Sequence, residues 1–170
     1  MYDPTKPFNI LHDRDNTLIK DYPYQSGNSK IEILRPALST LQSVSEFSNF
    51  FVITNQSDIN RGFFSYDDYS VFTNSMINLF GEHDIRFAAV YFCPHRPEEN
   101  CNCRKPKPGL YERVSQEFNV SKQSTFMIGD KPSDMKFAEN CNLKKSFLIN
   151  SSEQLLSWQI VQNYFLRSIK

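Results

Sequence analysis

Two carboxylates, Asp13 and Asp15, stand two residues apart just after the apolar run at residues 8–11. Such a run is typical of a buried strand, and α/β proteins place their chemistry at the carboxyl ends of these strands. One carboxylate can act as a nucleophile and the other as a general acid or base, and both can reach one metal ion. The pair alone is compatible with several metal-dependent reactions and also with a solvated turn.

Three further groups of polar residues each follow an apolar run. Thr54 follows residues 50–53, a segment rich in Cys, His and Lys follows residues 87–92, and Asp130 follows residues 125–128. The carboxyl ends of parallel strands meet at one edge of an open α/β sheet. We therefore expect all four groups to lie together.

Strand-like runs alternate with segments of helical periodicity along the chain. Strands are predicted at 8–11, 50–53, 87–92, 125–128 and 147–149, and helices at about 36–47, 66–80, 108–118, 132 onward and 153–168. This order predicts an α/β fold: a Rossmann-like, doubly wound, mostly parallel five-stranded sheet with helices on both faces. Because no linker or repeat divides residues 1–170, we expect a single domain without a large cap domain.

The segment after the third predicted strand carries a second metal pattern, Cys93-x-His95 and Cys101-x-Cys103. Three thiolates and one imidazole are a usual donor set for structural zinc, and an odd number of thiols argues against disulfides. The proline-rich, acidic residues between the two pairs cannot form a core, so Zn²⁺ is predicted to staple this loop. The remaining cysteine, Cys141, is expected to be a buried packing residue.

The amino-acid composition of the chain indicates which kinds of partner it can bind. Among 170 residues, Lys plus Arg and Asp plus Glu both number 19, so no net positive field favours nucleic acid or a membrane surface. No apolar stretch reaches the ~20 residues that span a bilayer, and the first residues lack the layout of a signal peptide. We expect a cytoplasmic monomer that binds a small molecule rather than nucleic acid or a membrane.

Four motifs together carry a family resemblance: DRDNT (13–17), TNQSDINRG (54–62), CPHRPEENCNCRKPKPG (93–109) and IGDKPSDM (128–135). In order and spacing they resemble the phosphatases of the haloacid dehalogenase (HAD) superfamily. Within it, the chain looks most like the branch that holds D,D-heptose 1,7-bisphosphate phosphatase and the histidinol-phosphatase domain.

The resemblance implies roles for the residues at the matching positions. Asp13 would be the nucleophile that forms an aspartyl-phosphate, and Asp15 would be the general acid and base. Mg²⁺ would be held by the Asp13 side chain, the Asp15 main-chain carbonyl and Asp130. Thr54 and Lys105 would hydrogen-bond the phosphoryl oxygens.

The resemblance also implies contacts to a small phosphorylated substrate. Arg104 offers a planar fork for a second phosphate or another anion. Asp134 is either close to the metal site or simply a first-turn helix residue favoured by the helix dipole, and His12 is expected to be a core histidine. The other expected substrate contacts are Arg14, Asp21, Tyr24, Asn55, Gln56, Ser57 and Lys131.

Several positions depart from the family pattern and leave the substrate open. Asn16 replaces the usual glycine, which is tolerable if its φ is positive, and Asp58 and Asn60 replace small residues. The segment NQSDINRGFF favours a heptose 1,7-bisphosphate 7-phosphatase over a histidinol-phosphate phosphatase. A third hypothesis is a zinc-stapled binding protein that kept the fold and lost activity.

Overall fold

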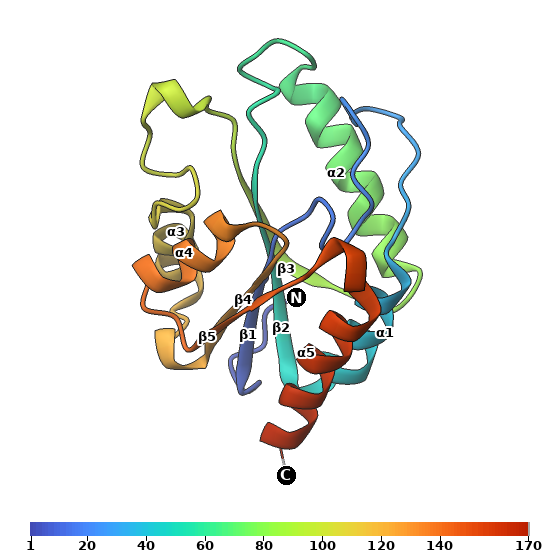
Figure 1. The fold of residues 1–170 in the computed structure, drawn as a ribbon, viewed down its shortest axis with the longest axis vertical. Coiled ribbons are helices and arrows are strands. Elements are labelled where there is room, and N and C mark those ends of the chain that lie inside the picture. The colour runs from blue at the N-terminus through green and yellow to red at the C-terminus, as the bar shows by residue number, and fades with distance from the viewer. Residues whose placement is uncertain (170) are drawn as a thin grey trace.

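A computed structural model describes residues 1–169 of the chain and shows one five-stranded sheet (Figure 1). All neighbouring strands pair in parallel, in the spatial order β3-β2-β1-β4-β5. The predicted doubly wound sheet is thereby confirmed. The strands are β1 (Phe8–His12), β2 (Ser48–Asn55), β3 (Phe87–Cys93), β4 (Thr125–Gly129) and β5 (Lys145–Leu148).

Helices cover both faces of the sheet, as predicted (Figure 1). One face carries three helices and the other carries two, and short 3₁₀ turns at 45–47, 97–99, 122–124 and 151–153 connect the elements. The first face holds α1 (Arg35–Val44), α2 (Tyr66–Gly81) and α5 (Gln154–Ser168), and the second holds α3 (Gly109–Phe118) and α4 (Pro132–Asn140).

Alternate residues of the central strands point into two separate cores. On β1, Ile10 packs with the core under α1, α2 and α5, whereas Leu11 packs with the core under α3 and α4. Because successive side chains of a strand face opposite sides, a strand buried on both faces is mostly apolar, with occasional buried polar residues such as Asn9 on β1. This is why residues 50–53 form a continuous apolar run.

Two element boundaries show what a local sequence pattern can and cannot predict. Ser65 caps α2 as predicted: its hydroxyl accepts a hydrogen bond from the Asp68 amide at 3.1 Å, and the Asp68 carboxylate accepts from the Ser65 amide at 3.0 Å. The fifth strand begins at Lys145, two residues before the predicted start, because main-chain pairing with Phe126 extends it through polar residues. A pattern of apolar residues does not predict this pairing.

The order of the strands creates a crevice for a ligand. The chain builds β1, β2 and β3 outward on one side and then returns to place β4 and β5 on the other side of β1. In open α/β sheets the crevice outside the carboxyl ends at such a reversal is the usual binding place. Within residues 1–169, no helix has the length and apolar character needed to cross a membrane.

His12 ends β1 in a fully buried position, as expected of a core histidine. Its Nδ1 lies 3.2 Å from the Phe51 carbonyl oxygen, and its ring packs near Phe50 and Trp158. Burial lowers the pKa of His12 to about 4 despite hydrogen bonds to main-chain carbonyls. The imidazole is therefore neutral at pH 7.

This depressed pKa predicts acid sensitivity. Between pH 6.5 and about 4 the unfolded chain binds a proton at His12 that the folded chain does not. Folding stability should therefore fall as the pH is lowered through this window, by up to about 3 kcal/mol. Urea unfolding at pH 7.5 and pH 5 should show a smaller loss in His12→Phe than in the wild type. The exposed His83→Gln variant is the control, and an equal loss in all three proteins would contradict the prediction.

Candidate active site

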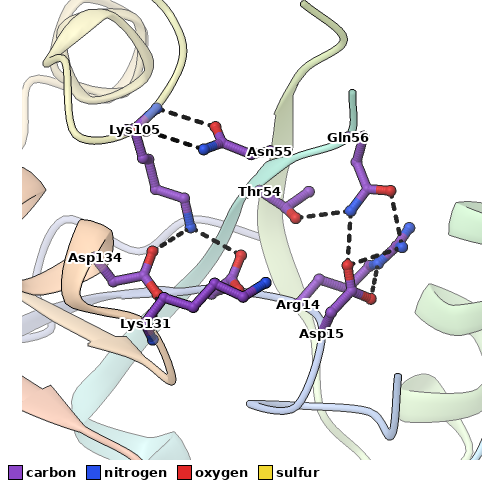
Figure 2. A network of polar contacts seen from close by, with 9 residues as sticks. Arg14, Asp15, Thr54, Asn55, Gln56, Lys105, Lys131 and Asp134 are labelled. Carbon is purple, nitrogen blue, oxygen red and sulfur yellow. Dashed lines mark hydrogen bonds and ion pairs between the residues drawn. The ribbon is translucent and has the colours of Figure 1, made fainter. Parts of the chain in front are cut away.

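The four polar groups meet at the carboxyl edge of the sheet. Asp13 follows β1, Thr54 lies near the end of β2, Lys105 comes from the loop after β3, and Asp130 follows β4. Figure 2 shows Lys105, Thr54 and Asp134 converging from separate elements. The expectation that these groups lie together is confirmed.

A buried lysine joins two carboxylates at the centre of this edge. The Lys105 ammonium lies 2.8 Å from Oδ1 of Asp13 and 2.6 Å from Oδ1 of Asp134 (Figure 2). All three residues are at most 4% exposed. A buried charge is tolerated when it is paired in this way, so the three groups hold one another in place.

The charges of this cluster reinforce one another. Burial alone would raise the pKa of Asp13, but Lys105 and then Lys131 outweigh it and hold that pKa below its ordinary value. Burial alone would lower the pKa of Lys105, but Asp13 and Asp134 outweigh it and raise that pKa. At neutral pH Asp13 is therefore a carboxylate and Lys105 an ammonium.

Three carboxylates form a group that fits a hard cation. Oxygen atoms of Asp13, Asp130 and Asp134 lie within 4.8 Å of one another. Oδ1 of Asp130 is buried without a hydrogen-bond partner, and burial followed by the charge of Asp13 raises the pKa of Asp130 to about 6. An all-oxygen set with an unsatisfied member suits Mg²⁺. The carboxylate of Asp15 is not part of this group, whereas Asp134, whose place the sequence left open, is.

The Asp15 carboxylate lies outside this group, in a polar network. Arg14 Nε donates to Oδ1 of Asp15 at 2.8 Å, and Nη2 approaches Oδ2 at 3.1 Å. Gln56 Nε2 donates to Oδ2 at 2.8 Å and to Oγ1 of Thr54 at 2.9 Å (Figure 2). These contacts connect the turn after β1 to the end of β2.

Asn55 ties the same strand end to the Lys105 loop. The Lys105 amide donates to Oδ1 of Asn55 at 3.0 Å, and Nδ2 of Asn55 donates to the Lys105 carbonyl at 3.1 Å. Such a pair fixes the main chain from which the Lys105 side chain extends. The structure therefore places Asn55 beside Lys105 as well as at the cavity described next.

A polar cavity of about 220 Å³ opens beside the carboxylates. Two expected substrate contacts that line it, Tyr24 and Lys131, are exposed, and the Tyr24 ring packs against Phe63 with centroids 4.6 Å apart. The other expected contacts that line it are Arg14, Asp21, Asn55, Gln56 and Ser57. Four further residues that were not among the predicted contacts also line it: Tyr22, Pro23, Gln25 and Phe64.

Arg104 is the expected substrate contact that the structure does not bring to this cavity. Its Nη1 donates to the His95 carbonyl at 3.0 Å, and its side chain lines a separate hollow with Pro97 and Lys107. The adjacent Lys105 turns inward instead. Neighbouring residues of an irregular loop can face opposite ways, which spacing along the sequence cannot reveal.

The predicted Cys and His ligands form one cluster. The Sγ atoms of Cys93, Cys101 and Cys103 and Nδ1 of His95 lie within 4.8 Å of one another, with individual separations of 3.2–3.6 Å. All of the cysteines are free thiols, and Cys141 is buried elsewhere, as expected. Three thiols and an imidazole at this spacing can hold a metal ion.

Asn16 has the backbone conformation that favours glycine. Its φ is +54°, and its Oδ1 accepts a hydrogen bond from the Asp21 amide at 3.2 Å. Asparagine is among the non-glycine residues that most readily adopt this conformation. The departure from the family motif therefore preserves the turn.

Gly129 is required by the close approach of Asp134. A Cβ atom at this position would lie 2.5 Å from Cγ and 2.6 Å from Cβ of Asp134. We expect Gly129→Ala to cost about 1–3 kcal/mol in the free energy of unfolding, because Asp134 must move away from Lys105. Urea denaturation measures this cost. Gly81→Ala is the control, because its Cβ would meet only the flexible end of Arg86, and equal stability of the two variants would contradict the prediction.

Comparisons with known proteins agree with this architecture. Residues 102–165 match the sequence family described as HAD-hydrolase-like. D-glycero-beta-D-manno-heptose-1,7-bisphosphate 7-phosphatase of Helicobacter pylori is 37% identical over 142 residues, which is 82% of this chain and 82% of that protein. The histidine biosynthesis bifunctional protein HisB of Legionella pneumophila is 33% identical over 95% of this chain but only 46% of that protein.

A solved structure has the same fold. The D,D-heptose 1,7-bisphosphate phosphatase from B. bronchiseptica, complexed with magnesium and phosphate, superposes with a TM-score of 0.82. It is 21% identical, and the match covers 95% of this chain and 99% of that one. With the identity to the Helicobacter protein, these findings show that the chain is a phosphatase that belongs to the HAD-like family, in the branch of the heptose bisphosphate phosphatases.

Proposed function

We propose that this phosphatase removes the 7-phosphate of D-glycero-D-manno-heptose 1,7-bisphosphate through an aspartyl-phosphate on Asp13. The observation that carries the reaction is the ion pair of 2.8 Å between Asp13 and Lys105 at the edge of the sheet. It keeps a buried carboxylate charged and aims a cation at the place where phosphoryl oxygens must lie. The identity to relatives of that name supports the substrate.

The reaction proceeds in two balanced halves. An Asp13 oxygen attacks phosphorus while the bond from phosphorus to the sugar oxygen breaks, and Asp15 gives its proton to that leaving oxygen. Asp15 then takes a proton from water, whose oxygen attacks phosphorus and breaks the bond to Asp13. Lys105 and the hydroxyl of Thr54 hydrogen-bond the phosphoryl oxygens throughout.

The carboxylates of Asp13, Asp130 and Asp134 support a resident Mg²⁺. Asp13 and Asp130 would hold the ion with the main-chain carbonyl of Asp15, and Asp134 would hold Lys105 beside them. When bound, the ion supplies positive charge that offsets the repulsion between the nucleophile and the phosphate dianion. We likewise propose that Cys93, His95, Cys101 and Cys103 bind one structural Zn²⁺.

The residues that line the cavity are of types that can bind a sugar. The Ser57 hydroxyl and the Gln25 amide oxygen, which has no partner among the described residues, can exchange hydrogen bonds with sugar hydroxyls, while Tyr22 and Phe64 offer apolar ring surface. Of the two cations that line the cavity, Arg14 is paired with Asp15, and Lys131 acts on the charge of Asp13. A polyhydroxylated phosphate ester therefore fits this site.

Two carboxylates of the cavity other than Asp15 favour a second candidate substrate. Asp21 and Asp58 both line the cavity, and burial followed by the charge of Asp15 raises the pKa of Asp21. Carboxylates attract a cation such as the ammonium group of histidinol phosphate and repel a second phosphate. The likeness to the Legionella protein agrees with this alternative.

Parallel steady-state assays decide between the two substrates. With Mg²⁺ present, we expect kcat/KM for heptose 1,7-bisphosphate to exceed that for histidinol phosphate by at least tenfold. Asp58→Ser should then lower KM for the bisphosphate, because it removes a charge that repels the second phosphate. Equal or better turnover of histidinol phosphate would overturn the proposed substrate but not the reaction.

A further inference from the structure

Arg14 is held firmly by its neighbours inside the protein. It is only 3% exposed, and its guanidinium lies over the ring of Phe72 on α2, 5.0 Å from the ring centroid. Nε and Nη2 form a fork on the carboxylate of Asp15, and Nη2 also donates to Oε1 of Gln56 at 2.9 Å. Nη1 alone has no hydrogen-bond partner among the described residues, so the contacts of Nε and Nη2 with Asp15 and Gln56 stay in place whether or not a substrate binds.

Gln56 completes the arrangement by joining two parts of the site. Its two amide hydrogens satisfy two acceptors, Oδ2 of Asp15 at 2.8 Å and Oγ1 of Thr54 at 2.9 Å. Its main-chain amide donates to the Cys93 carbonyl at 2.7 Å, which anchors it to the end of β3. The position of Asp15 is thus linked to the residue that faces the phosphoryl group.

We propose that Arg14 and Gln56 are positioning residues that fix the Asp15 carboxylate relative to Asp13. This inference rests on the proposed role of Asp15 as general acid and base. Arg14 supplies a planar fork backed by an aromatic ring, and Gln56 ties that fork to Thr54. Substrate contact by either side chain is not required.

The geometry explains why a fork is needed at this place. Arg14 and Asp15 are adjacent in the chain, and both oxygens of Asp15 accept hydrogen bonds, so the plane of the carboxylate is fixed. A general acid works only if its proton lies in line with the leaving oxygen, and a displacement of about 1 Å can cost about 10²-fold in rate. A single-point cation such as lysine would leave the plane free to rotate.

The proposal makes a prediction that depends on the leaving group. A sugar alkoxide must be protonated as it leaves, whereas p-nitrophenolate leaves without a proton. Loss of Asp15 positioning should therefore slow cleavage of a sugar phosphate far more than the release of p-nitrophenolate. Loss of a substrate or phosphate contact would affect both esters.

The test compares Arg14→Met and Arg14→Lys with the wild type. Single-turnover rates are measured with enzyme in excess and Mg²⁺ present, on heptose 1,7-bisphosphate and on p-nitrophenyl phosphate. We expect both variants to slow the sugar ester about 10- to 100-fold, with p-nitrophenolate release and the KM for the sugar ester within about threefold of wild type. Arg113→Met is the control, because Arg113 also lies over an aromatic ring, that of Tyr91, but outside this network.

A second variant keeps the proposal testable if the Arg14 variants fail to fold. Gln56→Leu leaves the ion pair of Arg14 with Asp15 in place and should give the same selective loss at about tenfold. A raised KM with unchanged kcat, or equal losses on both esters, would overturn the proposal and make Arg14 a substrate ligand. Unchanged kinetics in all variants would overturn it while leaving the proposed function standing. A wild type without activity on any phosphate ester would instead overturn the proposed function, and this inference with it.

Discussion

An Asp13→Asn variant should lose at least about 10⁴-fold in kcat for every phosphate ester that the wild type hydrolyses. The amide has nearly the shape of the carboxylate but lacks the charged oxygen that attacks phosphorus. It also cannot pair with the Lys105 ammonium, which retains Asp134 at 2.6 Å. Because that second ion pair remains, we expect the variant to fold. Phosphate release in the presence of Mg²⁺ measures the loss.

The control for this variant is a matched change elsewhere. Asp84 lies in a turn with a φ of +62°, a conformation that asparagine adopts readily. Asp84→Asn should keep wild-type activity and stability. Activity of Asp13→Asn above about 1% of wild type, with circular dichroism unchanged, would remove Asp13 from the role of nucleophile and would favour another carboxylate of the site.

The central strands could be predicted because their burial leaves a direct trace in the sequence. A strand covered on both faces, such as β2, is apolar in its middle, so the run at residues 50–53 predicted it, although buried polar residues such as Asn49 extend it. The order of strands and helices then placed Asp13 and Thr54 at one edge. The glycine of the family motif implied that Asn16 is tolerable if its φ is positive, and the structure shows a φ of +54° there.

Side-chain partners could not be predicted in the same way. The sequence suggested that Arg14 and Arg104 contact the substrate. The structure places Arg14 at the cavity, where it also pairs with Asp15, and turns Arg104 away to the His95 carbonyl. Asp134 could be a helix-turn residue or part of the site, and only the approach of Lys105 to 2.6 Å decides between them. Such choices depend on contacts between residues far apart in the chain, which a local pattern does not contain.

The second large effect concerns the cysteine cluster: loss of one of its ligands should lower both the zinc content and the activity. Purified wild-type protein should contain one zinc ion per chain, measured by elemental analysis, and Cys103→Ser should contain far less. Zinc contributes on the order of 10–16 kcal/mol to the folding of small metal-stapled units, so the loop should lose its fixed structure without it. Lys105 follows Cys103 by two residues, and only the two hydrogen bonds to Asn55 would then hold its main chain to β2. We therefore expect kcat to fall by at least about 10²-fold.

Cys141 provides the matched control for this effect. It is a buried cysteine at the C-terminal end of α4, and its thiol is not part of the four-ligand cluster. Cys141→Ala should keep one zinc ion per chain and wild-type kcat, with only a loss of stability from the smaller side chain. If Cys103→Ser kept both zinc and activity, the cluster would not hold the metal. If Cys103→Ser lost zinc but kept full activity, the zinc-bound loop would not be needed to position Lys105. The contacts of Lys105 with Asn55, Asp13 and Asp134 would then be enough to hold it in place.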